Sequence, residues 1–237
     1  MPILPELIRY LRRPVFTTSR VPVNARAMAE LLKLLGITLI LALMSVTIVS
    51  GFYSALSGET AKISEDFEAM SKEPRFFYMA VILAPIYEEL LFRSWFGRVW
   101  SLMLAMPLLL AVLAILALTG QSEAMPNIAT LGFVAVITSL GFYLRRYFDT
   151  KSVAGAHERA AQQIFPYVFW GCAVIFGLIH MTNYAGSGFQ PLLMLMVIPQ
   201  FIIGAILGFV RMRYGLLQAI VFHGAYNSVF VGLSFLG

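Results

Sequence analysis

The sequence is a succession of long apolar stretches separated by short polar connections, and this pattern restricts what the chain can fold into. Crossing the hydrocarbon core of a bilayer takes about 20 predominantly apolar residues in a helix. Only 12% of the residues are charged and 59% are hydrophobic, whereas soluble domains are about 25% charged and about 45–50% apolar. The charges are too few to cover a water-soluble domain, so the sequence predicts a protein embedded in lipid.

Seven stretches fit membrane-spanning helices, the form in which a chain satisfies its own backbone hydrogen bonds in lipid. They are Leu34–Leu56, Phe76–Trp95, Val99–Thr119, Ile128–Leu144, Ile164–Met181, Leu192–Val210 and Leu216–Leu236. The expected fold class is therefore all-α, a polytopic transmembrane helix bundle of about seven spans. Residues 1–33 are expected to form a basic cytoplasmic N-terminal segment, and residues 34–237 a single membrane-embedded catalytic domain.

The N-terminal segment contains a stretch with the pattern of an amphipathic helix that lies on an anionic membrane surface. Apolar side chains recur there at helical spacing, and three arginines point elsewhere: Leu4, Leu7, Ile8 and Leu11 against Arg9, Arg12 and Arg13. A solvated basic tail is the alternative interpretation.

The distribution of Lys and Arg predicts the orientation of the chain in the membrane. If the N-terminus is cytoplasmic, 14 of the 17 Lys and Arg residues fall in inside connections, and only Lys62, Lys72 and Arg75 fall outside. Seven crossings would place the C-terminus outside, and we expect a bacterial plasma membrane. The net charge of +5 then reflects topology rather than nucleic-acid binding, which would need a basic face in water.

Few ionisable side chains lie within the predicted spans, and each is a candidate functional group because burying one in lipid costs about 2.5–3.5 kcal/mol or more. Glu89 and Arg93 are one helical turn apart and can form an ion pair. Glu88 is turned about 100° round the helix and has no evident local partner. Pro85 removes a backbone hydrogen bond and should kink the helix beside Glu88.

Two later spans carry polar groups at the same helical spacing. His223 and Asn227 are four residues apart, and so are Phe176 and His180. Polar groups on three helices are best explained if their faces meet around one wet cavity. There Glu88 could deprotonate a water molecule that His180 assists or holds, while His223 and Asn227 stabilise an oxyanion. Structural alternatives are a buried ion pair for the carboxylates and interhelical hydrogen bonding for Asn227.

Three ordered motifs resemble those of the CAAX prenyl endopeptidase and bacteriocin-processing (CPBP) intramembrane glutamic proteases. The motifs are Glu88-Glu89-x-x-x-Arg93, Phe176-x-x-x-His180 and His223-x-x-x-Asn227, and the similarity runs from about Pro85 to Asn227. The glycine pair Gly204-x-x-x-Gly208 is similar to a glycine-containing helix of that family, and its spacing suits close helix packing.

The resemblance implies roles for these positions. The first Glu and the motif histidines would activate water for peptide hydrolysis, and the last His and Asn would form an oxyanion hole. The implied catalytic residues are Glu88, His180, His223 and Asn227, with Glu89, Arg93 and Phe176 in support. One departure concerns the connection between Glu89 and His180, which holds the predicted pair of spans within residues 99–144. That pair would preserve chain direction but alter substrate access.

Other functions fit parts of the pattern. Ser187 with His223 could act as a rhomboid-like pair, and Glu88, His180 and His223 could bind zinc, although we expect no metal and no cofactor. A proton-coupled transporter could use the carboxylates and histidines as a relay, and a catalytically silent scaffold or immunity protein could keep the fold. The expected partners are the lipid bilayer and a peptide or protein substrate in the membrane, prenylated or not; the oligomeric state is left open.

Overall fold

The computed structural model describes residues 3–17, 19–94, 96, 156–184 and 191–234. These residues form an all-helical bundle without strands, which confirms the expected fold class for this part of the chain. The α-helices are α1 (Ile3–Arg12), α2 (Ala25–Ser57), α3 (Glu65–Ser71), α4 (Arg75–Tyr78), α5 (Ala84–Arg93), α8 (Ala156–Leu178), α9 (Ile198–Arg213) and α10 (Leu216–Ser234). A π-helical turn, η1 (Met79–Leu83), joins α4 to α5, and the 3₁₀ segments η2 (Ile179–Asn183) and η3 (Pro191–Val197) follow α8 and precede α9.

Among the residues that the structure describes, four helical segments are long and apolar enough to cross a membrane: Ala25–Ser57, Ala161–Asn183, Leu192–Arg213 and Leu216–Leu233. They correspond to four of the predicted spans. The stretch predicted as Phe76–Trp95 is helical from Arg75 to Arg93 but contains the π turn η1. The predicted spans Val99–Thr119 and Ile128–Leu144 lie outside the described residues, so the count of seven stays a prediction.

Helix α2 begins earlier than its apolar stretch predicts. The side chain of Asn24 accepts a hydrogen bond from the Ala27 amide over 3.0 Å and caps the first turn. At the other end Gly58 takes a left-handed φ of 74°, a conformation that suits glycine at a helix C-terminus. Residues 25–33, predicted to be part of the N-terminal segment, are thus the first turns of a 33-residue helix.

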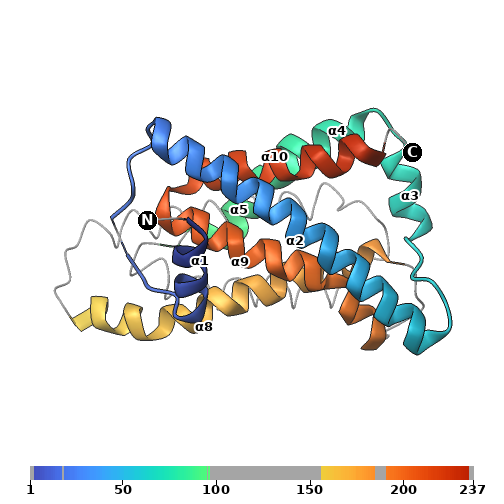
Figure 1. Cartoon of the computed structure of the whole chain (residues 1–237), viewed down its shortest axis with the longest axis horizontal. Helices are drawn as coiled ribbons and strands as arrows, with labels where there is room; N and C mark the ends of the chain where they lie inside the picture. The colour runs from blue at the N-terminus through green and yellow to red at the C-terminus, as the bar shows by residue number, and fades with distance from the viewer. Residues whose placement is uncertain (1–2, 18, 95, 97–155, 185–190, 235–237) are drawn as a thin grey trace, which may run out of the picture.

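Helix α1 crosses the long helices at one end of the bundle (Figure 1). Its Leu7 is buried in the protein rather than facing outward, so the expectation that one stripe of leucines and isoleucines meets the membrane is wrong for this residue. The ring of Tyr10 packs against Phe169 and Phe209 at centroid distances of 5.6 and 5.3 Å. Leu4 and Ile8 are exposed, as expected.

Charged groups hold α1 and the start of α2 to the end of α9. Arg213 forms ion pairs with Glu6 of α1 and Glu30 of α2, and the Tyr214 hydroxyl donates to Glu30 over 2.9 Å. These contacts explain why α1 is docked on the protein, since three segments share one cationic side chain.

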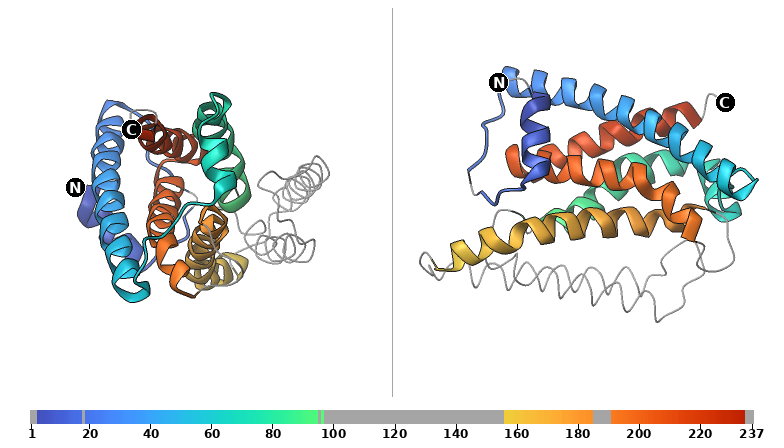
Figure 2. Two further views of the ribbon diagram at one scale, coloured as in Figure 1. Left: turned by 90° about the vertical axis from the view of Figure 1, so that its right-hand side faces the viewer. Right: turned by 60° about the horizontal axis from the view of Figure 1, so that its bottom comes forward.

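Helix α9 lies centrally between α2, α8 and α10 (Figure 2). Its two glycines allow α8 to approach closely, as the small-residue spacing predicts. A Cβ atom on Gly208 would lie 2.5 Å from Cε2 of Phe169, and one on Gly204 would lie 3.0 Å from Cδ1 of Phe176. The aromatic side chains of α8 therefore occupy the space that side chains at these positions of α9 would need.

Near the end of α9, Arg211 is buried and caps another helix. Counting Lys and Arg assigned it to a cytoplasmic connection, yet its side chain reaches the C-terminus of α5. Its Nε donates to the carbonyl of Arg93 over 2.9 Å, and its Nη2 donates to the carbonyl of Phe96 over 2.6 Å. A cation at a helix C-terminus satisfies free carbonyls and opposes the helix dipole, so Arg211 fixes the end of the helix that carries both glutamates.

The glycine contact yields a stability prediction. Gly208→Ala should lower the free energy of unfolding by about 1–3 kcal/mol, because the new methyl group overpacks a buried ring. Gly51→Ala is the matched control, because nothing outside the adjoining backbone of its own helix lies within 4 Å of its Cβ position among the described residues, and alanine favours a helix. Thermal unfolding in detergent should show a lower midpoint for Gly208→Ala alone. Equal midpoints for the two variants would contradict the packing.

Candidate functional site

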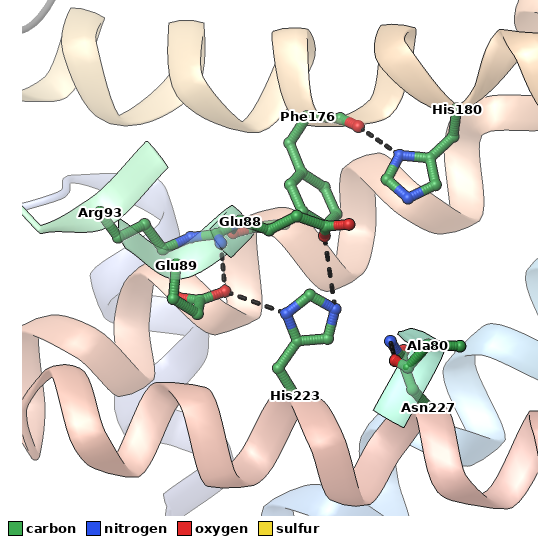
Figure 3. Close-up of polar contacts among 9 residues, drawn as sticks. Ala80, Glu88, Glu89, Arg93, Phe176, His180, His223 and Asn227 are labelled. Atoms are coloured by element: carbon green, nitrogen blue, oxygen red, sulfur yellow. Dashed lines mark hydrogen bonds and ion pairs between the residues drawn. The ribbon is translucent and has the colours of Figure 1, made fainter. Parts of the chain in front are cut away.

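Side chains from α5, the α8–η2 junction and α10 meet within the bundle (Figure 3). Phe176 and His180 come from α8 and η2, and His223 and Asn227 come from α10 on the opposite side. Glu88, Glu89 and Arg93 lie between them on α5. The three faces that the sequence predicts to meet around one cavity do lie together.

The centre of the site is a buried ion pair. Glu89 and Arg93, with side chains 0% and 1% exposed, are joined by a hydrogen bond from Arg93 Nη1 to Glu89 Oε1. The Nη2 of the same guanidinium donates to the carbonyl of Gly204 over 3.0 Å, and the group lies 4.7 Å from the ring centroid of Phe176. Arg93 thus compensates the charge of Glu89 and fastens α5 to α8 and α9.

His223 connects the two glutamates. Its Nδ1 lies 3.1 Å from Glu89 Oε1, and its Nε2 lies 3.7 Å from Glu88 Oε2. The partner that the local sequence does not provide for Glu88 therefore comes from α10. The Glu88 side chain is 22% exposed whereas that of Glu89 is fully buried, so the first glutamate is the one that water can reach.

The contacts of His223 restrict where its protons lie. The carboxylate of Glu89 is paired with Arg93 and accepts hydrogen bonds, so Nδ1 of His223 must carry a hydrogen. Nε2 faces the carboxyl group of Glu88. At 3.7 Å this contact is an ion pair only when His223 is protonated. With both glutamates ionised and His223 protonated, the four charges including Arg93 sum to zero.

His180 stands on the first turn after α8. Its Nδ1 lies 2.7 Å from the carbonyl oxygen of Phe176, and its ring is 5.0 Å from that of Phe176. A carbonyl can only accept, so Nδ1 carries the hydrogen and Nε2 of the neutral ring keeps its lone pair. The ring of Phe176 also contacts His223, at a centroid distance of 5.8 Å, and thereby links His180 to the glutamate group.

Pro85 is accompanied by the π turn η1, which the sequence does not predict. In this turn the amide of Ala84 bonds to the carbonyl of Met79, five residues earlier. The carbonyl of Ala80 would next need an N–H from residue 85, and proline has none. The side-chain Nδ2 of Asn227 donates to the Ala80 carbonyl instead, over 2.8 Å.

Gly224 allows α10 to approach this turn. A Cβ atom at residue 224 would lie 2.7 Å from the carbonyl oxygen of Val81, so a larger residue would push the helices apart. The close approach brings Asn227 within reach of Ala80. A small residue next to a motif histidine is the only signal in the sequence for this contact.

The structure brings together most, but not all, of the predicted groups. Glu88, Glu89, Arg93, Phe176 and His223 form one connected cluster, and His180 joins it through Phe176. Asn227, by contrast, is hydrogen-bonded to a backbone carbonyl rather than to another predicted site residue, among those described. The carbonyls of Gly204 and Ala80 were not predicted, because the sequence does not indicate backbone acceptors.

Alternative sites receive less support. Within the described part of the chain, no three His, Cys, Asp or Glu side chains are grouped so that they could hold a metal ion, which gives the zinc alternative of Glu88, His180 and His223 no arranged site. Metal-free chemistry itself stays a prediction. Ser187, the nucleophile of the rhomboid-like alternative, lies outside the described residues.

Comparison with known proteins gives one match. The family model described as type II CAAX prenyl endopeptidase Rce1-like matches residues 71–229, which include every predicted site residue. Neither the curated proteins nor the solved structures contain a match. The matched range confirms the family resemblance that the three motifs indicate.

The buried ion pair yields a prediction that separates it from surface pairs. Arg93→Met should lower the free energy of unfolding by about 3–5 kcal/mol, because it leaves the charge of Glu89 buried without a partner. Lys72→Met is the control, since it breaks the exposed pair with Glu68 at the same helical spacing and should leave the unfolding midpoint unchanged. Thermal unfolding in detergent distinguishes them, and an Arg93→Met midpoint equal to the control would contradict the assignment.

Proposed function

The chain belongs to the type II CAAX prenyl endopeptidase Rce1-like family of integral membrane proteins, and on that premise we propose that it is an intramembrane endopeptidase of the glutamic type. One observation supports the assignment most. Of two adjacent glutamates, Glu89 is neutralised by Arg93, and Glu88 is partly exposed beside His223. This division leaves one carboxylate available to act on water.

In the proposed reaction Glu88 is the general base. A water molecule hydrogen-bonded to Glu88 gives up a proton to the carboxylate as its oxygen attacks the carbonyl carbon of the scissile peptide bond. The Oε2 atom of Glu88 lies 3.7 Å from Nε2 of His223 and accepts no hydrogen bond among the described residues, so the carboxylate keeps acceptor capacity for a water molecule. The unprotonated Nε2 of His180 would hold or assist the same molecule.

The negative charge that develops on the carbonyl oxygen needs hydrogen-bond donors. Protonated His223 would offer its Nε2–H, and Asn227 would offer an amide N–H. When the peptide bond breaks, the proton taken up by Glu88 passes to the departing amine. Three residues have a supporting role in this scheme and transfer no proton. They hold His223 and His180 in position: Glu89, Arg93 and Phe176.

The substrate is a peptide segment that reaches the site from the membrane plane or from the cytoplasm. The family description points to carboxyl-terminal segments of prenylated CAAX proteins, and leader peptides or membrane-protein segments fit the same chemistry. We place the N-terminus in the cytoplasm of a bacterial cell and the C-terminus outside, as the distribution of Lys and Arg predicts. The peptide and the bilayer are the partners in this proposal.

A transporter and a silent scaffold remain the competing functions. A proton relay would also use Glu88 and the histidines, but it does not require one carboxylate to be neutralised while its neighbour stays accessible. A scaffold requires neither a neutralised carboxylate nor an accessible one. The pairing of Glu89 with Arg93 beside a partly exposed Glu88 favours hydrolysis over both.

The decisive experiment compares peptide termini in membranes that contain the wild-type chain with those in membranes that contain Glu88→Ala at equal abundance. We expect a set of termini to disappear with Glu88→Ala, because the general base is lost. Glu68→Ala, on the exposed helix α3, is the matched control and should keep the wild-type termini.

Other outcomes would identify the competing functions. Identical termini would favour the scaffold if cells that express Glu88→Ala also keep the phenotype of cells that express the wild-type chain. Identical termini would favour the transporter if cells that express Glu88→Ala lose that phenotype. Either result would contradict the proposed peptidase.

A further inference from the structure

We propose that Pro85 is a positioning residue for the reaction, because it leaves the Ala80 carbonyl free to orient the amide of Asn227. This inference rests on the proposed function and adds a residue to it. The observation behind it is a side chain of α10 that bonds to a backbone carbonyl of the π turn η1.

The π turn η1 contains a carbonyl that has no partner within its own helix. Each amide in a π turn bonds to the carbonyl five residues earlier, as Ala84 does with Met79. Continuing this register would pair residue 85 with Ala80, but proline has no N–H. A carbonyl without a donor is costly in a membrane, where water cannot replace it. The Ala80 carbonyl therefore binds a donor from outside its own helix.

The side-chain amide of Asn227 is oriented by its hydrogen-bond partner. Its oxygen and nitrogen ends are nearly the same shape, and only hydrogen bonding decides which end faces which way. A carbonyl accepts and never donates, so it selects the nitrogen end, and Nδ2 lies 2.8 Å from the Ala80 oxygen. One of the two N–H groups on Nδ2 is used there. Among the described residues nothing else bonds to Asn227, so its second N–H is left for the substrate oxyanion.

Helix α10 approaches the η1–α5 segment closely just before Asn227. Gly224 keeps α10 against Val81, and His223 is bonded to Glu89 one turn before Asn227. α10 is thus held to the η1–α5 segment at the turn just before Asn227. These contacts fix the distance at which Asn227 meets Ala80, so the direction of its amide depends on the free carbonyl rather than on helix mobility.

Pro85→Ala tests this account because it restores the missing N–H. The new amide can donate to Ala80 in the π register, or the turn can relax to α-helical bonding, and in both cases Asn227 loses its exclusive acceptor. We expect kcat to fall on the order of 10²-fold with KM unchanged, as for the loss of one oxyanion donor. Pro166→Ala, at a proline inside α8, is the matched control and should keep the wild-type kcat.

A double-mutant cycle shows whether Pro85 acts through Asn227. The wild type, Pro85→Ala, Asn227→Ala and the double variant are assayed on the peptide that the membrane comparison identifies, at equal protein abundance. We expect Pro85→Ala to cause no further loss once Asn227 is alanine. An equal fold loss in both backgrounds, or a wild-type kcat for Pro85→Ala, would overturn the inference.

Two further readouts keep the test decisive. If Pro85→Ala does not accumulate, Asn227→Asp decides, because it puts an acceptor oxygen against the Ala80 carbonyl. It should lose as much kcat as Asn227→Ala, and a wild-type kcat would overturn the inference. Failure of the proposed function is recognised separately, because the wild-type chain itself would then cleave no peptide, whereas failure of this inference leaves wild-type cleavage intact.

Discussion

The arrangement of the site depends on one interaction, the buried ion pair between Glu89 and Arg93. A carboxylate with no exposed surface is tolerated in an apolar bundle only when a cation compensates it. Arg93 does this and also donates to the carbonyl of Gly204, so the pair joins α5 to α9. Because Glu89 then accepts from His223, the same interaction fixes α10. These contacts also fix the position of Glu88, because it is adjacent in α5 to Glu89, whose charge Arg93 compensates.

Much of this could be predicted from the sequence, because lipid allows few polar side chains and each exception is visible. The spacing between Glu89 and Arg93 predicted their pairing, and the glycines of α9 predicted close helix packing, for which the structure supplies α8 as the partner. The grouping of Glu88, His180 and His223 near one another followed from the cost of leaving three polar groups in lipid.

The remainder could not be predicted, because it depends on contacts between distant segments and on backbone atoms. Nothing in the composition of α9 shows that Arg211 is buried and caps α5 rather than lying in a connection. The docking of Leu7 on the protein depends on the ion pairs of Arg213 with Glu6 and Glu30. Pro85 predicted a disturbed helix but not a π turn, and no pattern indicates that Asn227 reaches the carbonyl of Ala80.

The two adjacent glutamates have different roles, since Glu88 is the general base and Glu89 is the structural partner of Arg93. Amide substitutions at the two positions test this difference most directly. Glu88→Gln and Glu89→Gln are nearly isosteric, and both variants would be measured for peptide cleavage and for thermal unfolding in the same preparations. Glu88→Gln should unfold near the wild-type temperature while cleavage falls on the order of 10²-fold or more. Glu89→Gln should unfold at a lower temperature, because the charge of Arg93 is left buried. Wild-type cleavage by Glu88→Gln, or wild-type stability of Glu89→Gln, would contradict the account.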